Sequence, residues 1–322
     1  RIMVINGPFN LRLGDTAQVV IATVYGIGND NISSVAELKK NDLTAQIVFD
    51  QLFKLPSIDP PKVNVANLDR KVVLNWGSDA VNLTKIENFS DQGYTFEGYE
   101  VYQLPTASSS ITDGILLNTF DLINGITAIY DTVIDDNGMQ IPVLAAKGAD
   151  KGLQRYLVIK EDAFRKTELR NGQEYYFAVV AYAYNPSPLL PFHVLRSPAV
   201  VLVGKPQQPT PGFRYGNTVG DTLAVVHKGV SDGKVTPIVV DPTQLTGHTY
   251  EVVFRYENGQ TYWDVLDVSV NPPVVKAKDQ VNQEGGEDYP IVDGILIKVE
   301  GPPLVGKDWT AYGGDRWLTG NP

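Results

Sequence analysis

Apolar and polar positions alternate along most of this chain, and a period of two predicts β-strands in which every second side chain faces a core. The alternation is clearest at Val72, Leu74 and Trp76, and it recurs over residues 98–102 and 175–182. The pattern predicts a mainly β chain made of tandem β-sandwich domains.

A hairpin is predicted near the C-terminal end of this pattern. Residues 250–256 and 260–268 alternate in the same way, and Asn258 and Gly259 lie between them. Asn-Gly is favoured where both central turn residues need a positive φ. We therefore expect two antiparallel strands here, within a further β-sandwich.

One segment has a helical pattern instead. Ser34 and Glu37 have the spacing of a capping box, and Pro56 ends the pattern, so we expect a helix over residues 33–53. Its apolar side chains fall roughly on one side, which predicts an amphipathic helix docked on a sandwich. These side chains are Val35, Leu38, Ala45, Phe49 and Leu52.

Two proline-rich segments, residues 57–61 and 205–211, indicate linkers, because proline removes a ladder donor and extends the chain. Before the helix, the β-branched run over residues 19–25 predicts a strand covered on both faces. Four domains are predicted. Residues 1–56 form the C-terminal part of a preceding β domain plus the helix, and residues 57–205 form a sandwich with insertions. Residues 206–301 form a second sandwich, and residues 302–322 form an aromatic, glycine-rich tail or the start of a next domain.

Leu169, Gly172 and Tyr175 form a Leu-x-x-Gly-x-x-Tyr run, which places the tyrosine just after a corner where its hydroxyl can bond to upstream backbone. Together with Trp76 on an early strand and Tyr99 on the next, this run resembles a fibronectin type III sandwich. The resemblance implies an extracellular module that positions and binds other molecules. Residues 57–205 exceed the roughly 100 residues of a plain sandwich, so we expect insertions.

Charge excludes two classes of partner. The chain carries 27 Lys and Arg against 37 Asp and Glu, a formal net charge of −10, with no basic cluster. Such a field repels phosphate backbones and anionic lipid heads, so we expect neither nucleic-acid binding nor membrane insertion. No apolar run approaches the roughly 20 residues that span a bilayer. Because the sequence begins at Arg1, we expect a processed or excised part of a longer secreted protein.

The side chains that usually carry chemistry form no recognisable motif. Cysteine is absent, and His193, His227 and His248 are scattered without metal-ligand spacing. No nucleophile elbow, phosphate loop or dinucleotide fingerprint occurs. The acidic loops 135–137 and 284–288 lack the spaced ligands of a calcium loop, and we interpret them as solvated loops. The prediction is no enzyme, no cofactor and no metal.

Aromatic residues in the tail are candidate interaction residues: Trp309, Tyr312 and Trp317 lie among glycines and polar residues. Exposed Trp and Tyr are typical of surfaces that stack on sugars or bind proteins. The alternatives are that the segment begins a next domain, packs along a neighbouring domain, or adds to a sheet edge of another copy.

Three Asp-Thr pairs, each followed by a small or aliphatic residue, occur at Thr16, Thr132 and Thr222. The pattern resembles the O-glycosylation signal of secreted proteins in the Bacteroidota group. The alternative is that Asp-Thr simply begins strands.

The order of five segments resembles a block of very large bacterial surface proteins exported by the type IX system. These segments are residues 7–11, residues 14–16, the capped helix, the Pro-Pro linker and the type III strands. The resemblance implies the cell surface of a Gram-negative bacterium. Those proteins carry a C-terminal sorting domain, and its absence from residues 1–322 leads us to expect a fragment or a matured product.

The leading hypothesis is a non-enzymatic extracellular structural or adhesive protein that assembles with copies of itself or with other surface proteins into a filament, rod or surface layer. A second hypothesis is a set of accessory modules of a large secreted hydrolase or peptidase. A third is a carbohydrate-binding module, with glycans as the partner.

Overall fold

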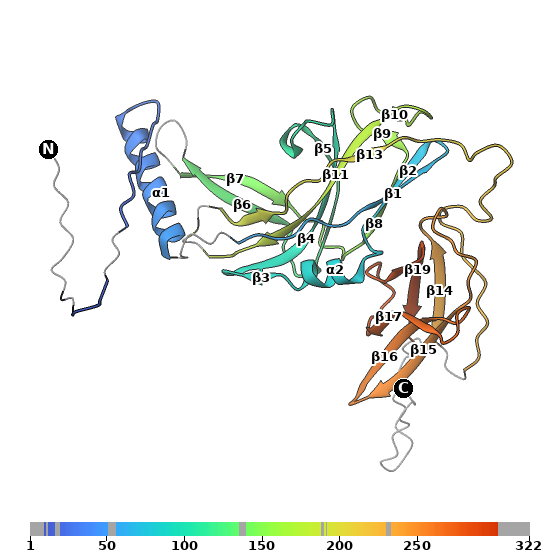
Figure 1. The fold of residues 1–322 in the computed structure, drawn as a ribbon. Coiled ribbons are helices and arrows are strands. Elements are labelled where there is room, and N and C mark those ends of the chain that lie inside the picture. The colour runs from blue at the N-terminus through green and yellow to red at the C-terminus, as the bar shows by residue number, and fades with distance from the viewer. Residues whose placement is uncertain are drawn as a thin grey trace, which may run out of the picture. The chain divides into compact units, whose positions relative to one another are not determined.

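The computed structural model describes residues 10, 12–16, 20–50, 56–134, 140–187, 190, 192–229 and 233–301. The chain is mainly β, as its alternating pattern predicts (Figure 1). Its contacts define two compact units: unit 1 comprises Arg1–Leu55, Tyr130–Leu144 and Ser187–His193, and unit 2 comprises Pro56–Ile129, Ala145–Pro186 and Val194–Pro322.

In unit 1, helix α1 (Asn31–Asp50) begins earlier than predicted. The Asp30 carboxylate accepts a hydrogen bond from the backbone N–H of Ser33 at 2.7 Å, which is the bond of an N-cap residue. The Ser34 hydroxyl donates to the Asp30 carbonyl at 2.6 Å from inside the helix. The predicted cap at Ser34 is therefore wrong, because an aspartate four residues upstream caps the first turn.

Apolar side chains of α1 remain exposed within this chain. Val35, Leu38 and Phe49 keep 52%, 40% and 42% of their surface accessible. Residues 51–55 lie outside the described residues, so the predicted end of the helix does too. Docking of this helix on a sandwich stays a prediction.

The predicted strand over residues 19–25 is not formed in its described part. Val20, Ile21 and Tyr25 have no strand assignment, and they are 43%, 74% and 73% exposed. A β-branched run becomes a strand only where a neighbouring strand completes its ladder of hydrogen bonds. No described strand pairs with this segment.

Unit 2 contains two antiparallel sheets on either side of a core. The smaller has the order β1-β2-β8 (Asn64–Leu68, Lys71–Asn75 and Tyr156–Ile159). The larger has the order β12-β11-β4-β3, with β5 on β4 and β13 on β11. The bounds of its strands are β3 Ser90–Asp91, β4 Tyr94–Leu104, β5 Ile115–Asp121, β11 Tyr175–Tyr184, β12 Val194–Arg196 and β13 Leu202–Gly204.

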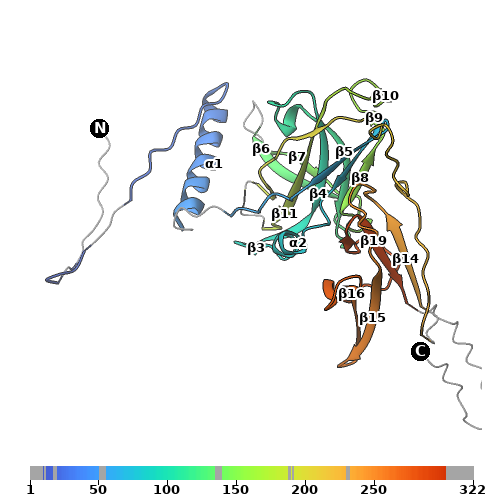
Figure 2. The same ribbon diagram turned by 45° about the vertical axis from the view of Figure 1, so that its right-hand side comes forward.

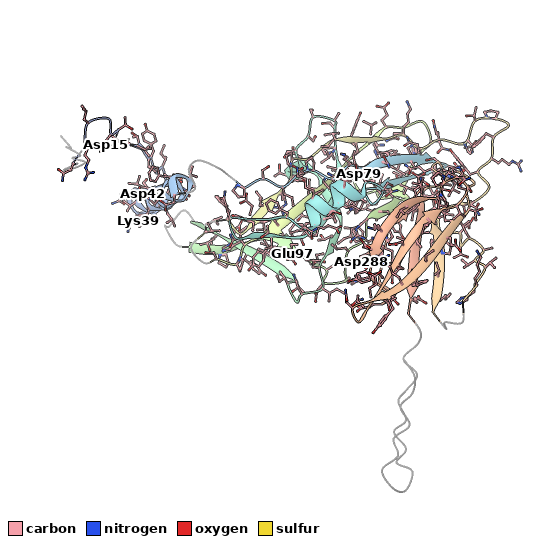
Figure 3. All side chains as sticks on the ribbon, turned by 60° about the horizontal axis from the view of Figure 1, so that its bottom comes forward. Asp15, Lys39, Asp42, Asp79, Glu97 and Asp288 are labelled. Atoms are coloured by element: carbon pink, nitrogen blue, oxygen red, sulfur yellow. The ribbon has the colours of Figure 1, made fainter. Side chains whose placement is uncertain are left out.

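Short elements complete this part of the chain. Helix α2 (Ala80–Glu87) is capped by Asp79, whose carboxylate accepts from the N–H of Asn82, and Asp79 is labelled in Figure 3. The other elements are the 3-10 helix η1 Ile111–Asp113 and the two-stranded sheet of β9 Glu161–Asp162 with β10 Thr167–Glu168. A further two-stranded sheet, β6 Ala128–Ile134 with β7 Gln140–Lys147, has most of its residues in unit 1.

The core between the two larger sheets, called core A here, is built on aromatic side chains. Trp76 packs against Tyr99 with ring centroids 5.7 Å apart and against Phe120 at 5.9 Å. Val72 and Leu74 join them, and none of their surface is exposed. These are the positions that the alternating pattern assigns to one face.

The remaining strands of unit 2 form two three-stranded sheets, in the orders β14-β19-β18 and β15-β16-β17. Their bounds are β14 Lys234–Val239, β15 Tyr250–Glu257, β16 Gln260–Asp267, β17 Val274–Gln280, β18 Ile291–Val292 and β19 Ile295–Glu300. Strands β15 and β16 are joined at Asn258 and Gly259, both with positive φ, as the hairpin prediction requires.

A second core, core B, joins these strands to the β1-β2-β8 sheet. Val73 points away from core A and is fully buried together with Trp263, Tyr289 and Leu296. The β1-β2-β8 sheet is therefore covered on both faces and forms a middle layer within unit 2 (Figure 2). Residues from both predicted domains, 57–205 and 206–301, thus share one core; the boundary between them stays a prediction.

Candidate functional site

Two of the three predicted Asp-Thr sites lie in the same kind of turn. In the first, the N–H of Asp15 donates to the carbonyl of Arg12 at 2.9 Å, and the N–H of Arg12 donates to the Asp15 carboxylate at 2.8 Å. Gly14 supplies a φ of 93°. The carboxylate thus closes a four-residue turn and holds the following Thr16 at its exit. Asp15 lies in the segment that precedes α1 (Figure 3).

The second turn repeats this geometry in unit 2. The N–H of Asp221 donates to the carbonyl of Thr218 at 3.1 Å, and the N–H of Thr218 donates to the Asp221 carboxylate at 2.7 Å. Gly220 has a φ of 94°, a conformation that residues with a Cβ adopt at a cost. A Gly-Asp pair therefore closes the same kind of turn twice, in distant parts of the sequence.

Both threonines that follow these turns, Thr16 and Thr222, are exposed. Thr132 differs: it lies within strand β6 and is half-buried, and the preceding Asp131 accepts from the N–H of His193 at 2.7 Å. Two of the three predicted glycosylation residues thus share one local structure, and the third does not.

The sequence similarity extends beyond the turns. Residues 13–20 and 219–226 both follow the pattern Leu/Val-Gly-Asp-Thr-x-x-Val-Val. Sequence reasoning recognised only the Asp-Thr pairs. The equal spacing of the glycine and the two valines in both copies is the signal that could have revealed the longer repeat.

The residues named as a structural signature lie in and around core A. Tyr175 is buried at the start of β11, and its hydroxyl accepts a hydrogen bond from the backbone N–H of Arg170 at 2.9 Å. Gly172 has a φ of 81° in the corner, and Leu169 is buried in core A. Tyr99 also reaches the edge of core A, where its hydroxyl donates to Glu87 at 3.1 Å.

Two half-buried arginines neutralise the half-buried Glu87 and the buried Glu100. Arg155 donates to both oxygens of Glu87 at 2.8 Å, and Arg196 donates to both oxygens of Glu100 at 2.7 and 2.9 Å. Two-pronged geometry is the strongest form of this pair. Arg196 also donates to the carbonyl of Ala145 at 2.6 Å, so the pair ties β4, β7 and β12 together. These acids therefore serve the fold.

A second group of carboxylates has no arginine. Glu97, shown in Figure 3, accepts from the Asn124 amide at 2.9 and 3.0 Å, and burial raises its pKa. Asp121 accepts from the N–H groups of Ala149 and Asp150, and burial raises its pKa as well. Within the described residues, no group of His, Asp and Glu is arranged to hold a metal ion.

One histidine pair was missed by sequence reasoning. Nδ1 of His248 lies 2.7 Å from the buried carboxylate of Asp267, whose pKa is lowered mainly by this hydrogen bond. Nineteen residues separate the two in sequence, and only the β15-β16 hairpin brings them together. His193 is half-buried beside Asp131, and His227 is exposed.

The other predicted features are dispersed or undescribed. In the acidic loop 284–288, the N–H of Gly285 donates to the Tyr289 hydroxyl at 2.9 Å, and the loop closes on core B. Residues 135–137 and the aromatics Trp309, Tyr312 and Trp317 lie outside the described residues. A shallow hollow of about 420 Å³ is lined by Arg70, Thr167, Glu168, Leu169, Arg170 and Asn171.

No protein-family model, curated protein or solved structure matches this chain. Among the described residues, no helix combines the length and the apolar character needed to cross a bilayer.

Proposed function

We propose that this chain is a non-enzymatic structural or adhesive module of an extracellular protein, which assembles with copies of itself or with other surface proteins into a rod, filament or surface layer. The observation that carries the proposal is the middle layer of unit 2. Val72 and Leu74 are buried on one face of β2 and Val73 on the other, so the flanking sheets are held on a common support. A shared sheet of this kind limits movement of the flanking sheets against each other, which suits a module of a rod, filament or surface layer.

The finer fold belongs to the same proposal. Core A and its two sheets form a fibronectin type III-like sandwich, and the strands of residues 206–301 form a second β-sandwich domain. The buried Trp76 of the early strand and the corner bond between Tyr175 and Arg170 support this assignment. Buried and half-buried carboxylates that accept hydrogen bonds from arginine or backbone N–H groups support a structural role for these acids.

We place the protein at the cell surface of a Gram-negative bacterium that exports it by the type IX system, and we propose O-glycosylation at Thr16 and Thr222. Their exposure at the exit of an ordered turn supports the modification, since a transferase needs an accessible hydroxyl. Intact mass of the native protein tests it. The unmodified polypeptide mass would end this part of the proposal.

Sedimentation of the purified chain over a wide concentration range tests the assembly, together with electron microscopy of the native cell-surface fraction. We expect concentration-dependent multimers and an ordered array. A chain that stays monomeric at high concentration, with no array on native cells, would contradict the proposal and favour accessory modules of a larger secreted enzyme.

A further inference from the structure

The two Gly-Asp-Thr turns lead into equivalent segments, and within the described residues only the second is paired. The N–H of Leu223 donates to the carbonyl of Pro237 at 3.0 Å, and the N–H of Val239 donates to the carbonyl of Asp221 at 2.8 Å. Thr222 therefore lies opposite Ile238 on the outer edge of β14. The second copy of the motif therefore pairs with this edge of the sheet.

The pairing on this edge is short. Among the described residues it does not continue past Leu223, and Val225 and Val226 are 49% and 83% exposed. Pro237 has no N–H to donate, which suits an edge strand. Part of β14 is thus open to a longer partner strand.

The first copy of the motif has the stronger strand pattern. Residues 19–25 read Val-Val-Ile-Ala-Thr-Val-Tyr, whereas residues 225–229 read Val-Val-His-Lys-Gly. β-branched and aromatic residues favour strands, and lysine and glycine do not. The described part of the first run nevertheless has no partner strand, and its residues other than the half-buried Val24 are exposed. Its last carbonyl, that of Tyr25, accepts a hydrogen bond from the Asn41 side chain at 2.7 Å.

Apolar positions also match between the two copies. Tyr215, Val219 and Leu223 pack against core B. The equivalent positions of the first copy are Phe9, Leu13 and Ala17, which are all apolar. Leu13 is fully exposed in its own chain. The first copy therefore keeps apolar side chains at these three positions, with the smaller Ala17 in place of Leu223.

We propose that the N-terminal segment, residues 12–25, of one molecule adds to the outer edge of β14 in a second molecule. Its residues 12–21 then take the place that residues 218–227 have within their own chain. The register follows from the repeat: Thr16 lies opposite Ile238, and residues 16–20 pair with residues 234–238. The inference rests on the proposed self-assembly and names its contact. A head-to-tail contact of this kind generates filaments when the rotation does not close.

The resident segment competes with the incoming one. It is held by the bonds of Gly220, Asp221 and Leu223 and has the advantage of being in the same chain. Exchange is therefore favoured at high local concentration, as on a crowded surface, and the longer strand of the incoming segment offsets the lost tether.

Because the chain has no cysteine, two introduced cysteines are the only residues that can form a disulfide in a cross-linking test. Thr222 and Ile238 form a non-hydrogen-bonded pair, the kind in which Cα atoms lie close enough for a disulfide. The test protein carries Thr16→Cys with Ile238→Cys and is oxidised at high concentration. We expect a ladder of covalent multimers that collapses to monomer on reduction, with peptides in the mass spectrum that are disulfide-linked between positions 16 and 238.

Two matched variants control this experiment. Thr222→Cys with Ile238→Cys closes the resident pair, so it reports folding and forms a disulfide within one chain. Thr23→Cys with Ile238→Cys is out of register and gives no ladder under the same conditions.

Each remaining outcome is decisive. This contact is overturned, and self-assembly stands, if the unsubstituted chain forms multimers but the test protein shows no link between positions 16 and 238. The same conclusion follows if the only links join two copies of position 16. An unsubstituted chain that is monomeric at every concentration overturns both the contact and the assembly.

Discussion

Arg155 and Glu87 lie 68 positions apart in sequence and form a two-pronged ion pair, with both nitrogen–oxygen distances at 2.8 Å. Their side chains are only 12% and 19% exposed. Arg155 also donates to the carbonyl of Tyr289 at 3.4 Å, and Tyr289 belongs to core B. The pair therefore links α2 and the start of β8 to the last part of unit 2.

Removing one member of this pair should destabilise the protein strongly. We expect Arg155→Met to lower the free energy of unfolding by about 3 kcal/mol, because it leaves the largely enclosed Glu87 carboxylate without its cation. Adding Glu87→Gln should recover part of the loss, with a coupling of about 1–3 kcal/mol in the double-mutant cycle. Urea unfolding of the single and double variants measures both quantities.

Arg70→Met is the control for this cycle. Its partner Glu168 is 3.4 Å away, and both side chains are largely exposed, so the change should cost under about 1 kcal/mol. Equal losses for Arg155→Met and Arg70→Met would contradict a special role for the buried pair.

The corner hydrogen bond of Tyr175 should contribute measurably to stability. Tyr175→Phe leaves the N–H of Arg170 without its acceptor, and we expect a loss of about 1–2 kcal/mol. Tyr176→Phe is the matched control, since that hydroxyl contacts the exposed Glu174 at 3.5 Å. Chemical denaturation should show little change for the control. A tolerated Tyr175→Phe would mean that water replaces the bond.

Stability should respond to pH through Glu97. Burial raises the pKa of Glu97 in the folded state, so the folded protein binds a proton more readily than the unfolded chain. Its contribution is therefore most favourable at low pH and declines as pH rises from the unfolded pKa through the folded pKa. We expect the difference in unfolding free energy between wild type and Glu97→Gln to shift in favour of wild type on acidification through the folded-state pKa of Glu97.

Unfolding of the two proteins at several pH values measures this difference. Asp121 lies beside Glu97 and keeps its own raised pKa in both proteins, so it largely cancels in the comparison. A difference that is independent of pH would show that Glu97 titrates alike in the folded and unfolded states.

The second Gly-Asp-Thr turn should be sensitive to a side chain at its glycine. Gly220 has a φ of 94°, so Gly220→Ala forces alanine into a strained conformation, at a cost of about 1–2 kcal/mol. Gly216→Ala is the control, because a Cβ there meets open space and its φ is ordinary. Thermal unfolding of both variants tests this; a loss at Gly216 as large as that at Gly220 would contradict the prediction.

Much of unit 2 could be read from local patterns. Alternation placed Val72, Leu74 and Trp76 on one buried face, and Asn258 with Gly259 marked a hairpin. Both signals come from residues close in sequence, where strand period and turn conformation are set by neighbouring backbone. The first turn of α1 was misplaced, because Asp30 and Ser34 both suit a cap and only the backbone geometry selects one.

The sequence predicted only part of the candidate glycosylation site. The three Asp-Thr pairs could be found in the sequence, but the difference in their local structure could not. Thr16 and Thr222 follow the same kind of turn, whereas Thr132 lies within a strand. The same residue type at Asp131 binds His193 instead of closing a turn, because that aspartate has no glycine before it and meets a distant segment.

By itself, the sequence determined the β class, the core face of β2, the hairpin and the corner of Tyr175. Only the tertiary structure decided that Val73 faces a second core, that Arg155 meets Glu87, and that residues 20–25 lack the partner that residues 221–223 have within the described chain. The physical reason is the separation in sequence of the residues that interact. Strand periodicity and turn conformation depend on neighbouring residues, whereas strand pairing depends on which distant segment the rest of the chain brings to each strand.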